Sequence, residues 1–171
     1  MMRSLSLASL VLYTGLACAE STQAGVWYGT STDEIIATHV QNDDGSMLSF
    51  LCTKSDKSCL WTISVGLTCD EKYEQPALAA TRMGSAHITM VCNGKLKESN
   101  LYMLYAKEYE MMNSLVSRGG VMGIALAKDD GQFIAFRFNV DGAKAAIENI
   151  ASALDRLPAS KKPASIRSNT F

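Results

Sequence analysis

The sequence predicts a mainly β (α+β) protein, an antiparallel β-sandwich or curled sheet with a C-terminal α-helix packed on it. Short segments of alternating or β-branched apolar residues follow one another along most of the chain. Gly, Asn and Asp separate these segments, as in the turn that ends Asp44-Gly45. Only the last apolar segment changes to helical spacing. Together these patterns indicate one sheet-based domain, followed by a helix.

Eight segments have the length and composition of strands. They span residues 26–30, 34–41, 47–53, 58–65, 86–92, 101–106, 121–127 and 132–140. In the fourth segment, Trp61, Ile63 and Val65 share one face, so we expect Trp61 in the core. In the last two segments, one face of each is apolar throughout. The residues that we expect to line the core there are Met122, Ile124, Leu126, Ile134, Phe136, Phe138 and Val140.

Three further segments complete the domain. Residues 70–84 begin with polar side chains, contain Pro76 and show little periodicity, so the pattern predicts a long loop. Residues 107–116 are assigned to a short helix. From Ala143 to Leu157 the apolar residues repeat at i, i+3, i+4 and i+7, which predicts an amphipathic helix with Asp141 as N-cap and Pro158 beyond its end.

The N-terminus is typical of a secretory signal peptide over residues 1–19. Arg3 precedes an apolar stretch at 5–16, and small residues lead to a cleavage site after Ala19. The alternative is a lipoprotein acylated at Cys18, which would tether the domain to a membrane. Removal of 19 residues from the 171-residue chain leaves a single domain at 20–157. The Ser-, Pro- and Lys-rich residues 158–171 are expected to be a disordered tail.

Charge and hydropathy exclude some partners of the processed chain. The formal net charge is −1, and loss of Arg3 makes it about −2, so no basic surface for nucleic acid is indicated. Beyond the leader, no apolar run approaches the roughly 20 residues of a membrane-spanning helix. We therefore expect a periplasmic or secreted protein with no membrane span.

Four cysteines remain after the leader, and an even number in an exported chain favours disulfides. Cys52 and Cys59 flank a polar stretch that is typical of a hairpin loop, so we expect them to pair, which leaves Cys69 for Cys92. A zinc site is the alternative, but the C-x6-C-x9-C-x22-C spacing lacks the close ligand pairs of such sites. No metal or cofactor is therefore expected.

The sequence holds no recognisable catalytic motif. It has two histidines, His39 on a predicted strand and His87 at the start of another, so histidine-based proton transfer would depend on one of them. G-x-S-x-G, H-E-x-x-H and phosphate-binding glycine motifs do not occur. We expect no enzyme, and an envelope hydrolase that uses His39 or His87 is the third hypothesis for function.

The most unusual composition after the leader lies at 102–112, where methionine and tyrosine gather. Both side chains adapt to partners at low entropic cost. Burial in the core is the structural alternative. The candidate partner-binding residues are Tyr102, Tyr105, Tyr109, Met111 and Met112.

Several motifs resemble those of exported Gram-negative bacterial proteins without an assigned activity. They are Trp27-Tyr28-Gly29, Asp44-Gly45-Ser46, Phe50-Leu51-Cys52, Cys59-Leu60-Trp61, Cys69, Pro76-Ala77-Leu78, Gly84 and Cys92. The final hairpin, which enters an Ala-rich helix through Val140-Asp141-Gly142, is similar to the end of the invasion-associated locus B family. The resemblance implies a periplasmic or secreted protein with a β-sandwich-like fold and no known catalytic residues.

These observations favour an exported, periplasmic module that binds another protein without catalysis, of the inhibitor, immunity or envelope-assembly type. The alternative is a secreted host-interaction factor similar to invasion-associated locus B. The sequence leaves the partner, the oligomeric state and the binding surface open.

Overall fold

The computed structural model describes residues 23–24, 27–96, 100–128 and 131–157, so the predicted leader and tail lie outside it. The described residues form ten antiparallel strands and two helices. The elements in chain order are β1 (Gln23–Ala24), β2 (Trp27–Ser31), β3 (Ile35–Gln41), β4 (Met47–Thr53), β5 (Cys59–Val65), β6 (Glu74–Thr81), β7 (Gly84–Lys95), β8 (Tyr102–Ala106), α1 (Tyr109–Val116), β9 (Val121–Ala127), β10 (Phe133–Asn139) and α2 (Ala143–Asp155).

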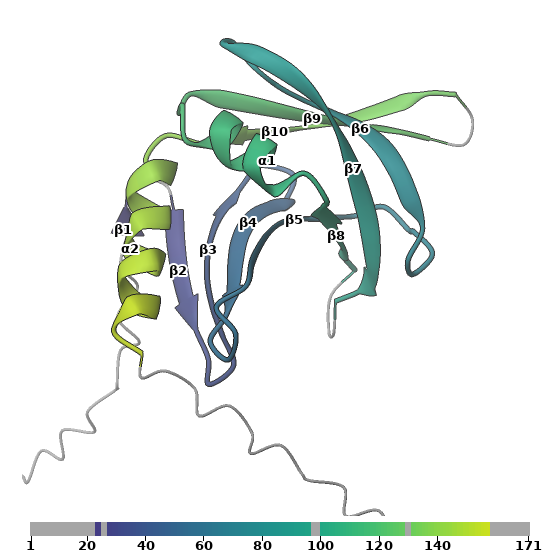
Figure 1. The fold of residues 1–171 in the computed structure, drawn as a ribbon. Coiled ribbons are helices and arrows are strands. Elements are labelled where there is room, and N and C mark those ends of the chain that lie inside the picture. The colour runs from purple at the N-terminus through teal and green to yellow at the C-terminus, as the bar shows by residue number, and fades with distance from the viewer. Residues whose placement is uncertain (1–22, 25–26, 97–99, 129–130, 158–171) are drawn as a thin grey trace, which may run out of the picture.

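All ten strands belong to one sheet, in the order β1-β2-β3-β4-β5-β8-β7-β6-β9-β10. The sheet curls so that β2 to β5 lie across from β6, β9 and β10, and α2 lies alongside β2 (Figure 1). The predicted fold class is confirmed, and of its two forms the curled sheet is the one observed.

The inner face of the curled sheet holds an aromatic cluster at its centre. Trp61 is fully buried, as predicted, with its ring centroid 5.0 Å from that of Phe50 and 6.2 Å from that of Trp27, which it meets edge to face. Edge-to-face and tilted pairs at these distances are favourable contacts between aromatic quadrupoles. The cluster therefore fixes how β2, β4 and β5 face the rest of the core.

The predicted inner face of the last hairpin is largely confirmed. Six of its seven residues are buried, whereas Ile134 is half-buried. Their register is regular, with Phe136 opposite Ile124 and Phe138 opposite Met122. Alternation along each strand thus identified the core side of β9 and β10 correctly.

The predicted loop at 70–84 is wrong, because this region contains strand β6. Residues 74–81 pair with β7 on one side and with β9 on the other. Pro76 fits because its pairing partner is Thr89 of β7, whereas pairing with β9 begins only at Ala77. The N–H that proline lacks is therefore not needed for hydrogen bonds between β6 and β9.

The entry into α2 also differs from the prediction. Asp141 is not the N-cap, since Gly142 occupies that position with φ of 80°. The Asp141 carboxylate instead accepts a hydrogen bond of 2.7 Å from the Gly120 N–H, just before β9. A left-handed residue at this point suits glycine, and the carboxylate ties the helix entry to the sheet.

The structure joins Cys52 to Cys59 and Cys69 to Cys92, the pairing expected from the spacing. Cys52 and Cys59 are direct cross-strand partners on β4 and β5, with Cα atoms 4.0 Å apart. The second bridge links β7 to the segment between β5 and β6, with Cα atoms 6.1 Å apart. One disulfide thus closes a hairpin, and the other fixes a crossover.

We predict that loss of the second bridge costs more stability than loss of the first. The loops they close span sequence separations of 23 and 7 residues. The loop-closure model gives about 3 kcal/mol for the longer loop and about 2 kcal/mol for the shorter. Urea unfolding of Cys69→Ala/Cys92→Ala and Cys52→Ala/Cys59→Ala should show this order, and the reverse order would contradict it.

Candidate protein-binding surface

The structure does not bring the five predicted partner-binding residues together. Met112 is fully buried among core residues of α1, so it cannot contact a partner in this structure. Tyr109 packs against the core, with its ring centroid 6.2 Å from that of Phe50. Burial raises the pKa of Tyr109, and the nearby Glu110 carboxylate raises it further. Met112 and Tyr109 therefore follow the structural alternative, which is burial in or against the core.

The other three predicted residues lie on separate surfaces. Tyr102 and Tyr105 are half-buried on β8 and, three positions apart on a strand, project to opposite faces of the sheet. Met111 is exposed on α1, with 46% of its surface accessible. The helical spacing of 109, 111 and 112 explains the division, because successive residues of a short helix turn toward different sides.

A continuous apolar surface occurs elsewhere, on the convex side of the sheet over three adjacent strands. We call it the outer apolar face. All its residues are exposed or partly exposed, and all are apolar. The members are Pro76, Leu78 and Ala80 of β6, Val121, Gly123, Ala125 and Ala127 of β9, and Phe133 and Ala135 of β10.

The strand register makes these residues neighbours. Leu78 lies opposite Ala125, which in turn lies opposite Ala135, so one row crosses the three strands. The next row runs from Ala80 through Gly123 to Arg137, which is the first charged residue at this edge. Leu78, Val121 and Phe133 are 38%, 60% and 72% exposed. Small residues between these larger ones leave a flat surface that a partner can approach closely.

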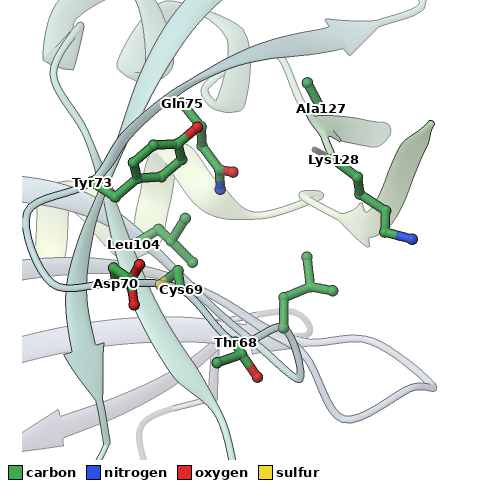
Figure 2. A pocket seen from close by; sticks show the side chains of 9 residues that line it. Thr68, Cys69, Asp70, Tyr73, Gln75, Leu104, Ala127 and Lys128 are labelled. Atoms are coloured by element: carbon green, nitrogen blue, oxygen red, sulfur yellow. The ribbon is translucent and has the colours of Figure 1, made fainter. Parts of the chain in front are cut away.

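A cleft of about 490 Å³ lies beside the second disulfide, between the β5–β6 crossover and the end of β9. Figure 2 shows Tyr73 and Gln75 on one side of the cleft, with Leu104 below them, and Ala127 and Lys128 on the opposite side. Leu104 is buried and gives the cleft an apolar floor. This volume lies within the range of ligand pockets.

Backbone bonds hold the crossover wall of the cleft in place. The Lys72 N–H donates to the Cys92 carbonyl at 2.8 Å, and the Cys92 N–H donates to the Tyr73 carbonyl at 2.9 Å. Tyr73 is half-exposed and Asp70 is exposed at the rim. An apolar floor with a polar rim suits an amphipathic side chain. Ala127 lines the cleft and also belongs to the outer apolar face, so the two meet at the end of β9, whereas Gln75 and Leu104 lie on the inner side of the sheet.

The two histidines lie far apart. His39 is on β3 and His87 on β7, which are four strand positions apart, or about 19 Å when measured along the curled sheet at the usual strand spacing. Within the described residues, neither one forms a hydrogen bond or an ion pair with a carboxylate. His39 is half-buried beside Tyr28, with ring centroids 5.8 Å apart, and burial lowers its pKa. Among the described residues, this geometry therefore offers the hydrolase hypothesis no histidine–carboxylate pair that could act as a general base.

Sequence reasoning missed the outer apolar face because one of its three strands, β6, was assigned to a loop. The alternation of Pro76, Leu78 and Ala80 with Ala77 and Ala79 is visible in the sequence. However, alanine and proline are weak strand formers, so the pattern carries little signal.

Comparisons with known proteins identify a fold. No family model matches the sequence, and no curated protein matches it. The crystal structure of invasion associated protein B from Bartonella henselae is similar in fold, with a TM-score of 0.59 and 12% identity. The match covers 79% of this chain and 98% of that one. At this identity the likeness establishes a shared fold.

No helix within the described ranges has the length and apolar character that crossing a membrane requires. In the same ranges, no three His, Cys, Asp or Glu side chains gather as a metal site would need.

We predict that His39 makes stability depend on pH. Because burial lowers its pKa in the folded state, protonation favours the unfolded chain. Stability should be complete above the unfolded value of about 6.5 and should fall as pH decreases toward the lower folded value. Urea unfolding between pH 5 and 8 should show a smaller decrease for His39→Gln.

His87→Gln is the control for this experiment, because it retains His39 and should retain the decrease. Equal pH profiles for the wild type and His39→Gln would contradict the prediction.

Proposed function

We propose that this chain is an exported module that binds another protein and performs no catalysis. The outer apolar face is the observation that carries this proposal. Nine adjacent apolar residues are at least partly exposed on one side of the sheet. Soluble monomers rarely expose large contiguous apolar areas unless these contact something. Strands β6 and β9 hold the face rigidly, as suits a preorganised interface.

The surroundings of the face have the anatomy of a protein interface. Arg137 and Asn139 border it on β10, and the cleft with Tyr73 and Lys128 adjoins its other end. An apolar centre with a polar rim is the usual arrangement at protein–protein contacts. We therefore assign the partner a flat surface of matching apolar character, with a side chain that enters the cleft.

Two disulfides support the export part of the proposal, since such bridges persist in oxidising compartments. A fold that needs no reducing environment suits the periplasm or the medium. Whether the protein acts in the periplasm or beyond the outer membrane is decided by cell fractionation.

The second candidate is a secreted host-interaction factor. The fold likeness to a protein named as invasion associated is the observation that favours it. Recovery of the protein in the culture medium, with a partner captured from host-cell extract only, would select this candidate. Capture from bacterial envelope extract would select the periplasmic module.

We predict that Leu78→Glu abolishes partner capture. Immobilised protein should recover one partner in stoichiometric amount from envelope or host-cell extract, and the charged variant should recover at least about tenfold less, because a buried unpaired carboxylate is costly. Leu78 is 38% exposed on the outer side of β6, so the fold should persist. Circular dichroism should confirm that the variant remains folded.

Met111→Glu is the matched control, since Met111 is a similarly exposed apolar residue outside the face. It should leave capture intact. Loss of capture with Met111→Glu but not with Leu78→Glu would refute the outer apolar face and favour the surface around α1. A His39→Ala variant, whose strand β3 lies outside the face, should also capture normally if binding is the function.

A further inference from the structure

Among the strands that the structure describes, β10 (Phe133–Asn139) forms one edge of the sheet. It is the last strand in the sheet order and pairs with β9 only. The opposite edge strand, β1, has two residues, whereas β10 has seven. The end of β10 that leads to α2 approaches β3, and the start of the strand lies on the side away from α2 (Figure 1).

The hairpin hydrogen bonds show which backbone groups of β10 face outward. The bonds that flank the hairpin join Val140 to Gly120 and Lys128 to Gln132. Both pairs continue the register of β9 with β10, so even-numbered residues of β10 exchange hydrogen bonds with β9. The odd-numbered residues direct their N–H and C=O groups away from β9. These are Phe133, Ala135, Arg137 and Asn139.

This edge lacks the features that usually prevent strands from pairing across molecules. Proteins protect long edges with lysine, proline or a bulge. Strand β10 contains no lysine or proline, and its register with β9 has no shift. Its one charged side chain, Arg137, is exposed and forms no hydrogen bond or ion pair with any residue that the structure describes.

We propose that β10 pairs antiparallel with β10 of a second copy of this chain, with the two Ala135 residues opposite each other. The outward N–H and C=O of each Ala135 then bond those of the other copy, as a hydrogen-bonded antiparallel pair requires. The proposal goes beyond the proposed function, because it concerns assembly and not the binding of a different protein.

Complementary side chains indicate that the strand pairing with β10 is β10 of a second copy of this chain. Phe133 and Arg137 lie two residues to either side of Ala135, on the same outer side of the strand. Pairing about Ala135 therefore places the 72% exposed ring of Phe133 opposite Arg137 of the second copy, and the symmetry creates this contact twice. Arginine above an aromatic ring is a favourable cation–π contact.

The inner sides of the two strands also match. Ile134 of each copy lies opposite Phe136 of the other in this register. Ile134 is the one predicted core residue of the hairpin that is only half-buried. The second copy would cover it with an apolar ring, which removes more apolar surface from water.

The position of Arg137 also selects the register. Pairing about Phe136 would satisfy the outward backbone groups as well, with Ala135 opposite Arg137. It would place the two Arg137 side chains diagonally across the strand pair, within reach of each other, where like charges repel. Pairing about Ala135 separates the two Arg137 side chains and gives each an aromatic partner.

The first test removes the outward N–H of Ala135. The full chain, produced with its leader in an oxidising compartment, is examined by sedimentation velocity over a range of concentrations. The wild type should reach twice the monomer mass. Ala135→Pro should raise the dimer Kd about tenfold or more, because two symmetric hydrogen bonds are lost and the proline ring obstructs the second strand.

Ile134→Pro is the matched control for backbone direction. Its N–H points toward β9, so this variant should lower the melting temperature, whereas Ala135→Pro should melt close to the wild type. If both variants have a lowered melting temperature, the proline test cannot separate folding from dimerisation, and hydrogen exchange of the wild type is measured instead. The Ala135 amide of the wild type should then exchange more slowly as concentration rises, and a rate independent of concentration would overturn the proposal.

The second test addresses the register through charge. Phe133→Arg places arginine opposite arginine and should raise the dimer Kd, and Arg137→Glu should raise it by loss of the cation–π contact. The double variant Phe133→Arg/Arg137→Glu should restore dimerisation through two opposite-charge pairs. No recovery in the double variant would refute pairing about Ala135.

If the wild type is monomeric at all concentrations, the proposed dimer is refuted. The edge strand β10 would then be available to an extended segment of another protein. This failure is distinct from failure of the proposed function. Leu78 lies two strands away from the edge, so Leu78→Glu should abolish partner capture but leave the dimer intact.

Discussion

The pairing of β5 with β8 is the constraint on which the rest of the fold depends. Strands β2 to β5 follow one another as sequential hairpins, but the next neighbour of β5 in the sheet is β8. The chain must therefore cross from β5 to β6 before it can return through β7 and β8. Trp61, at the centre of the aromatic cluster, lies on β5 next to the residues that pair with β8. The two halves of the sheet thus share a single core.

The crossover is also where the second disulfide and the cleft occur. Cys69 lies within the crossover and is bonded to Cys92 of β7, and the backbone of Lys72 and Tyr73 bonds to the same strand. A segment without strand partners of its own is thereby fixed to the sheet. The cleft wall has its shape because the crossover cannot move away from β7. The second disulfide and the shape of the cleft are thus both consequences of the crossover from β5 to β6.

Much of the fold could be predicted from local patterns, because most neighbouring strands are joined by short turns. Alternation identified the core side of β9 and β10, and the hairpin around Cys52 and Cys59 suggested their pairing. Helix α2 follows from its apolar stripe, although the structure ends it at Asp155. In each case the signal lies within about 20 residues, where periodicity and turn chemistry act together.

The parts that could not be predicted depend on distant partners. Strand β6 has three alanines and one proline among its eight residues, so its own composition is a weak strand signal, and it is held by β7 and by β9, which lies some 45 residues later. The cap of α2 was misassigned because the Asp141 carboxylate bonds Gly120, which is distant in sequence. The outer apolar face could not be predicted for the same reason. Residue type suggested tyrosine and methionine, but the exposed apolar surface is created by the register of β6, β9 and β10.

The same register connects the outer apolar face with the free edge of the sheet. Leu78, Ala125 and Ala135 form one row across the three strands, and Ala135 is the residue about which the proposed dimer is symmetric. Pairing of two copies would continue this row into the second sheet and place two binding faces side by side around one axis. A partner that itself presents two sites would then bind more tightly than one face allows, because the second contact forms at high effective concentration. An edge that would otherwise be an aggregation hazard is thus occupied by the interaction that aligns the two faces.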